Sequence, residues 1–149
     1  MAGGLANDSP IQSFTTSDAL DDAGYVMQVE QNGGEGTIVK GAPSGTLIGV
    51  AYTSTKDPIT DTAAADVKVP VLYARPGLRV YLQVVSDNQE IALLDPLCIT
   101  SDGAQKGKVD FKDGVNEDNT QIALALEAKA QNAGGTILAV LTAGVGESL

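Results

Sequence analysis

Two short apolar runs near the end of the chain, joined by a loop with paired glycines, constrain the fold most strongly. Gln121–Glu127 reads QIALALE, so its larger aliphatic residues alternate with alanines, and Thr136–Leu141 reads TILAVL. An alternation of period two indicates a strand, because successive side chains of a strand point to opposite faces. The glycines Gly134 and Gly135 suit the connection between the runs. The sequence therefore predicts two strands here, with a helical turn left open at Ala128–Asn132, where helix-favouring residues gather.

Similar short runs, separated by turn residues, recur through most of the chain. Glycine is frequent, with 17 residues, and NGGEG at Asn32–Gly36 is a typical turn cluster. Gly49 lies inside an apolar run and predicts a bulge or a close backbone approach, while Pro70 predicts an edge position or a bulge. The further predicted strands are Tyr25–Gln31, Thr37–Lys40, Thr46–Tyr52, Val67–Tyr73, Leu78–Val85, Ile91–Leu94, Leu97–Thr100 and Lys108–Lys112. This organisation predicts an all-β fold, a small glycine-rich β-barrel or sandwich.

The first 24 residues differ from the rest because they are small and polar, with only isolated apolar positions. They predict an extended, flexible N-terminal arm over residues 1–24, followed by a single β domain over residues 25–149. The arm either remains unordered, as many termini do, or orders on a neighbouring subunit. In the second case Phe14, one of only two phenylalanines, and Leu20 are the candidate contact residues.

The composition argues against most enzyme classes. The chain has no histidine, which excludes Ser-His-Asp and Cys-His catalysis and imidazole zinc sites. Its single cysteine, Cys98, excludes an intrachain disulfide and lies in an apolar stretch, where it is expected to be a small buried hydrophobic residue. We therefore expect no catalytic residues, and a protein that is not an enzyme.

Sites for metals, nucleotides and nucleic acids are also not indicated. Oxygen-bearing side chains cluster around Asp113, at Asp110, Asn116, Glu117 and Asp118, but they do not match the calcium-binding loop of EF-hands and are expected to form a solvated loop. The glycine-rich turns lack the Gly-Lys-Ser/Thr ending that phosphate loops require. The formal net charge of −10 is opposite to what phosphate contacts need. We expect no metal, no cofactor and no nucleic-acid partner.

The beginning of the chain, MAGGLANDSP, has neither the basic start nor the apolar core of a signal peptide. No apolar run approaches the ~18 residues of a membrane-spanning helix. The expectation is synthesis in the cytoplasm, without a membrane partner, and retention there or packaging into a particle assembled there.

The order of several motifs resembles the head-decoration, or cement, proteins of tailed bacteriophages. A polar arm is followed by TLIGVAY, then by VPVLYARPGLRVYLQVV and by DPLCITSDGAQKGKV. The closing element, QIALALEA followed by GGTILAVL, resembles the last two strands of these proteins. The resemblance covers residues 46–141 and rests on the order of the motifs, since each of them alone is compositional.

This resemblance implies a structural virion protein that binds the outer surface of an expanded capsid and stabilises it by bridging capsid subunits. The implied partners are the major capsid protein and further copies of the chain, with a trimer favoured. Lys68, Arg75 and Arg79 are the candidate contacts to acidic patches of the shell. The alternative is a phage tail or baseplate accessory domain or a host-surface binding module, which would share the β-rich, glycine-rich composition.

Overall fold

The computed structural model describes residues 10–30 and 36–149, so residues 1–9 of the predicted arm and most of the predicted turn at Asn32–Gly36 lie outside the described residues. Within the described ranges, the chain forms strands, turns and one short 3₁₀ helix, η1 (Gly103–Gln105), and the predicted all-β fold is confirmed. The strands are β1 (Ile11–Thr16), β2 (Val26–Val29), β3 (Thr37–Lys40), β4 (Leu47–Ala51), β5 (Val67–Tyr73), β6 (Arg79–Gln83), β7 (Pro96–Ile99), β8 (Val109–Phe111), β9 (Gln121–Ala125) and β10 (Thr136–Leu141). No helix in these ranges is long and apolar enough to cross a membrane.

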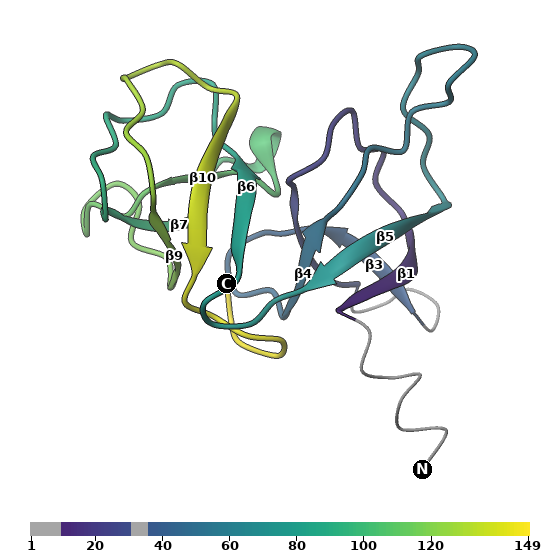
Figure 1. The fold of residues 1–149 in the computed structure, drawn as a ribbon, viewed down its shortest axis with the longest axis horizontal. Coiled ribbons are helices and arrows are strands. Elements are labelled where there is room, and N and C mark those ends of the chain that lie inside the picture. Colours follow the sequence, from purple (N-terminus) through teal and green to yellow (C-terminus); the bar gives the residue numbers. More distant parts are fainter. Residues whose placement is uncertain (1–9, 31–35) are drawn as a thin grey trace.

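The first five strands form a closed barrel in the order β1-β3-β2-β4-β5 (Figure 1). β1 closes it by pairing antiparallel with β5, from Ile11 opposite Leu72 to Thr16 opposite Val67, and parallel with β3. The prediction of an N-terminal arm is therefore wrong for residues 10–24. The polar sequence of Ile11–Thr16 does not reveal this strand, because the strand forms by pairing with β5 and β3, which are distant in sequence.

The other five strands form a second sheet in the order β6-β10-β9-β7-β8, which lies beside the barrel (Figure 1). The predicted closing pair is confirmed, since β10 pairs antiparallel with β9 and places Leu141 opposite Ala123. β10 also pairs with β6 on its other side. The helical turn left open at residues 128–132 does not form: Lys129 makes a β-bridge to Ile91, and the turn lies at residues 131–132.

Two hydrophobic clusters fill the molecule. One lies inside the barrel and includes Leu20, Met27 and Val71. The larger cluster packs the second sheet and also takes in Val26 and Val50 from the barrel wall. Because neighbouring residues on a strand point to opposite faces, β2 and β4 contribute side chains to both clusters, and these shared strands join the two sheets into one packed unit.

A bulge in β4 allows this strand to place side chains in both hydrophobic clusters. The pairing of β2 with β4 skips from Met27 opposite Gly49 to Gln28 opposite Leu47, so β4 carries an extra residue. A Cβ atom on Gly49 would meet the carbonyl oxygen of Leu72 at 1.9 Å. The predicted bulge and close backbone approach at Gly49 are both confirmed, and the bulge turns Val50 toward the second sheet.

Two further sequence predictions concern Pro70 and the run Ile91–Leu94. β5 is not an edge strand, so the edge position predicted from Pro70 is wrong. Pro70 lies where the pairing with β4 ends: its carbonyl accepts from Tyr52 N–H at 2.9 Å, and its missing N–H removes no bond to β4 itself. The strand predicted at Ile91–Leu94 is wrong. Leu93 and Leu94 are 62% and 59% exposed, and Leu94 has a φ of +67°, because this segment turns the chain into β7.

Candidate functional site

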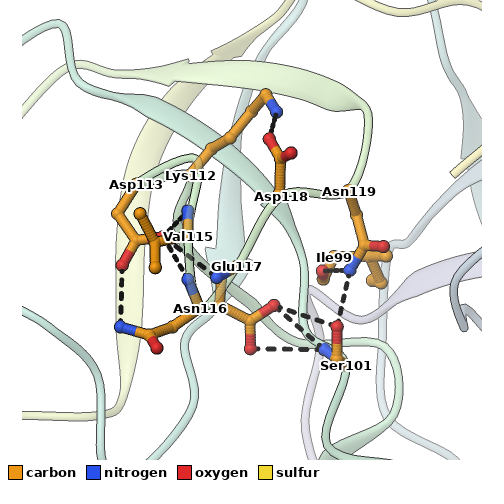
Figure 2. Close-up of polar contacts among 9 residues, drawn as sticks. All are labelled: Ile99, Ser101, Lys112, Asp113, Val115, Asn116, Glu117, Asp118 and Asn119. Atoms are coloured by element: carbon orange, nitrogen blue, oxygen red, sulfur yellow. Dashed lines mark hydrogen bonds and ion pairs between the residues drawn. The ribbon is translucent and has the colours of Figure 1, made fainter.

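The acidic loop after β8 is held by its own carboxylates (Figure 2). Asp113 Oδ1 accepts hydrogen bonds from the backbone N–H groups of Val115, Asn116 and Glu117 at 2.8, 2.8 and 3.0 Å. The N–H groups of Glu117 and Val115 hold the pKa of the Asp113 carboxyl below its usual range. Glu117 in turn accepts from the backbone N–H and the hydroxyl of Ser101.

These contacts give the acidic side chains of the loop partners within the protein. The Asp113 and Glu117 oxygens are already occupied by donors, and Asp118 pairs with Lys112. Across residues 10–30 and 36–149, no group of three or more metal-ligating side chains is positioned to hold an ion. Asp110 lies apart in β8, where burial raises the pKa of its carboxyl.

Cys98 is fully buried in β7, and burial raises the pKa of its thiol to about 11. A thiol with such a pKa is almost entirely protonated at neutral pH, and the thiolate is the reactive form. We expect the native protein to react with a chromogenic disulfide reagent at pH 8 at least a hundredfold more slowly than the protein in denaturant. Fast labelling of the native protein would show that this region opens readily.

The two contact residues predicted in the arm belong to the barrel. Leu20 is 0% exposed inside the barrel cluster, so its prediction as a contact residue is wrong. Phe14 in β1 is half-buried and packs edge-on against Tyr73, with ring centroids 6.0 Å apart. Both side chains are used to stabilise the barrel, which a sequence without knowledge of the β1–β5 pairing does not reveal.

The three predicted basic contact residues are all exposed, but they do not form one group. Arg75 lies in the turn after β5 and Arg79 begins β6. Lys68 lies near the opposite end of β5, roughly 20 Å along the strand from the turn. The structure therefore brings Arg75 and Arg79 to the same end of the molecule and separates Lys68 from them.

Arg79 also lines a cleft between the barrel and the second sheet, which we call the junction cleft. Its volume is about 280 Å³ and its walls are mostly apolar. The lining residues are Ala23, Gly24, Val50, Ala51, Tyr52, Leu72, Arg79, Val80 and Tyr81. Tyr52 and Tyr81 are 55% and 59% exposed, so they form the rim rather than the floor.

The edge of β6 that faces away from β10 borders the same cleft, and it is bonded to the barrel at Gln83, whose N–H donates to the Gly24 carbonyl at 3.0 Å. Val84 N–H donates to the Gly135 carbonyl and Leu141 N–H to the Leu78 carbonyl, so the even-numbered residues of this segment bond toward β10. By the alternation of an antiparallel ladder, the backbone groups of Arg79 and Tyr81 point the other way, toward the barrel. Sequence reasoning missed this cleft, because its walls come from segments that meet only when the two sheets pack.

Comparison with known proteins identifies no family. No protein-family model matches the chain, and no curated protein matches it.

Proposed function

We propose that the chain is a structural virion protein of the head-decoration class, which binds the outer surface of an expanded capsid and bridges its subunits. The observation that carries the proposal is the exposure of Arg75 and Arg79 near the β5–β6 turn of a protein with a net charge of −10. The chain has only nine basic residues against 19 acidic ones, and both of its arginines lie here. The order of the sequence motifs described above supplies the choice of class.

Charge explains why this end would face a shell. Among the described residues, neither arginine takes part in an ion pair, so both guanidinium groups are available to carboxylates of a partner. Arginine forms bidentate hydrogen bonds with carboxylates, which makes it well suited to protein interfaces. The net charge of −10 keeps the remaining surface soluble and repels copies that meet in wrong orientations.

The barrel suits a protein that must withstand mechanical load. A closed barrel has no free strand edges, so pulling on the molecule must break several ladders together. A modest contact per copy is sufficient, because many copies on a lattice act together through avidity.

Reversing the charge of both arginines tests the proposal. We expect Arg75→Glu/Arg79→Glu to weaken binding to expanded capsids of the source virus by at least tenfold, because two attractive contacts become repulsive. The measurement is co-sedimentation with expanded shells lacking the protein, with unexpanded shells alongside.

Lys106→Glu is the matched control, since it reverses an exposed charge at η1, away from this end. The control should bind like the unchanged chain. Absence of stoichiometric binding by the unchanged chain would contradict the decoration role and favour the tail-accessory or host-surface alternative. Equal binding by the double variant would instead contradict the role of the arginines.

A further inference from the structure

The hairpin between β4 and β5 presents the most exposed large apolar side chain of the described residues. Ile59 is 91% exposed, and Figure 1 shows this hairpin standing clear of the barrel. Two carboxylates, Asp57 and Asp61, flank Ile59 within two residues on either side. Asp61 also forms an exposed ion pair with Lys56, with Lys56 Nζ 3.8 Å from Asp61 Oδ1, so Asp57 is the carboxylate without such a pair among the described residues. We call residues 57–61 the knob.

The knob is built as a rigid turn. Lys56 bridges to Ala63 across its base, and Asp57 N–H donates to the Thr62 carbonyl at 3.0 Å. Asp57 Oδ1 accepts from the Ile59 N–H at 2.7 Å, which fixes the backbone that carries the apolar side chain. A backbone held in this way loses little conformational entropy when the turn is buried in a partner.

The junction cleft has the complementary chemistry. Its walls are mostly apolar, and the exposed residue Arg79 is one of the residues that line it. The four side-chain carbons of an isoleucine need roughly 120 Å³ if each takes about the ~30 Å³ of a water molecule, which fits within the 280 Å³ of the cleft. An apolar tip between two carboxylates matches a mostly apolar cleft that an arginine lines.

The distribution of residue types points to the same surface. The chain has four tyrosines and two arginines, and two of these tyrosines and one arginine line the junction cleft. Tyrosine and arginine are the residues most enriched where binding energy concentrates in protein interfaces. A single exposed isoleucine is ordinary by itself, whereas a rigid acidic knob and a matching cleft on the same chain form a complementary pair.

We propose that the knob of one copy inserts Ile59 into the junction cleft of a second copy, with Asp57 and Asp61 facing Arg79. The two surfaces lie at different places on the molecule, so the contact is head-to-tail: each copy offers its knob to one neighbour and its cleft to another. Such contacts close into a ring when the rotation between copies permits. Both proposals use Arg79: in an assembled copy Arg79 faces the knob of the neighbour, and Arg75 is the arginine left for the shell. Ile59→Asp keeps both arginines, so its effect on self-association is separate from capsid binding through them.

The proposed contact is tested with two variants, one that disrupts the knob and one that disrupts the cleft. Sedimentation velocity of the full chain at near-physiological salt should show self-association that Ile59→Asp weakens about tenfold or more, through loss of the buried isoleucine. Arg79→Glu should weaken it similarly, because the cleft then repels the knob. Val115→Asp is the matched control, since Val115 is 83% exposed on another loop and should not alter association.

An equimolar mixture of the two variants gives the decisive result. The Arg79→Glu chain retains its knob and the Ile59→Asp chain retains its cleft, so the mixture should form a one-to-one dimer and nothing larger. An unchanged chain that stays monomeric at all concentrations would overturn the proposal, as would an undiminished association of Ile59→Asp or a mixture without heterodimer. Capsid binding by a monomeric chain would leave the decoration role intact while overturning this contact.

Discussion

Gly49→Ala should lower the free energy of unfolding by about 3 kcal/mol, the upper part of the usual range for overpacked sites. The added Cβ would meet the Leu72 carbonyl oxygen at 1.9 Å and the Leu72 carbonyl carbon at 2.8 Å, and these are backbone atoms of the neighbouring strand. β4 and β5 must therefore separate at the bulge that joins the two sheets. Chemical denaturation followed by circular dichroism measures the loss.

Gly103→Ala provides the matched control for this substitution. A Cβ on Gly103 meets no atom within 4 Å, and its backbone is not in the left-handed region. We expect its free energy of unfolding to change by less than about 0.5 kcal/mol. A Gly49→Ala protein as stable as this control would show that the bulge can relax and that the close approach is not required.

Asn88→Ala is the second substitution with a large expected effect, a loss of about 3 kcal/mol. The Asn88 side chain is 0% exposed and makes three hydrogen bonds. Its Nδ2 donates to the carbonyls of Gln89 and Ala130 at 2.6 and 3.0 Å, and its Oδ1 accepts from the Gly134 N–H at 2.9 Å. Alanine would leave these backbone groups unpaired where water does not replace the amide.

Thermal unfolding monitored by calorimetry measures this effect, with Asn116→Ala as the control. Asn116 is exposed, and its amide makes one hydrogen bond to Asp113. The control should unfold close to the temperature of the unchanged protein. If the two variants unfolded at the same temperature, the Asn88 network would have no special role in holding residues 130–134 against the second sheet.

The strands whose alternation or apolar content is strong could be read from the sequence. The bounds predicted for Val67–Tyr73 and Thr136–Leu141 coincide with β5 and β10, and the bulge at Gly49 followed from a glycine within an apolar run. β1 could not be read in this way, because IQSFTT becomes a strand only through its neighbours β5 and β3. The prediction of a strand at Ile91–Leu94 is wrong for the opposite reason, because an apolar run can also form an exposed turn.

The candidate sites that are local in sequence could likewise be predicted, and those formed by tertiary packing could not. The sequence placed Arg75 and Arg79 beside one turn, which the structure retains, because both are local to the β5–β6 connection. It could not place Val50, Leu72 and Arg79 around one cleft, because their meeting depends on how the barrel packs on the second sheet. The rigid knob at Ile59 likewise looked like an ordinary polar loop until its hydrogen bonds were known.

The pairing of β1 with β5 has a consequence for folding during translation. β1 leaves the ribosome well before its antiparallel partner β5, so the barrel cannot close until Val67–Tyr73 has been synthesised. Contacts between residues so far apart in sequence slow folding, because the intervening chain must be ordered first. At a synthesis rate of ~5–20 residues per second, the nascent chain therefore carries unpaired strand edges for several seconds. We expect the chain to need chaperones during that interval.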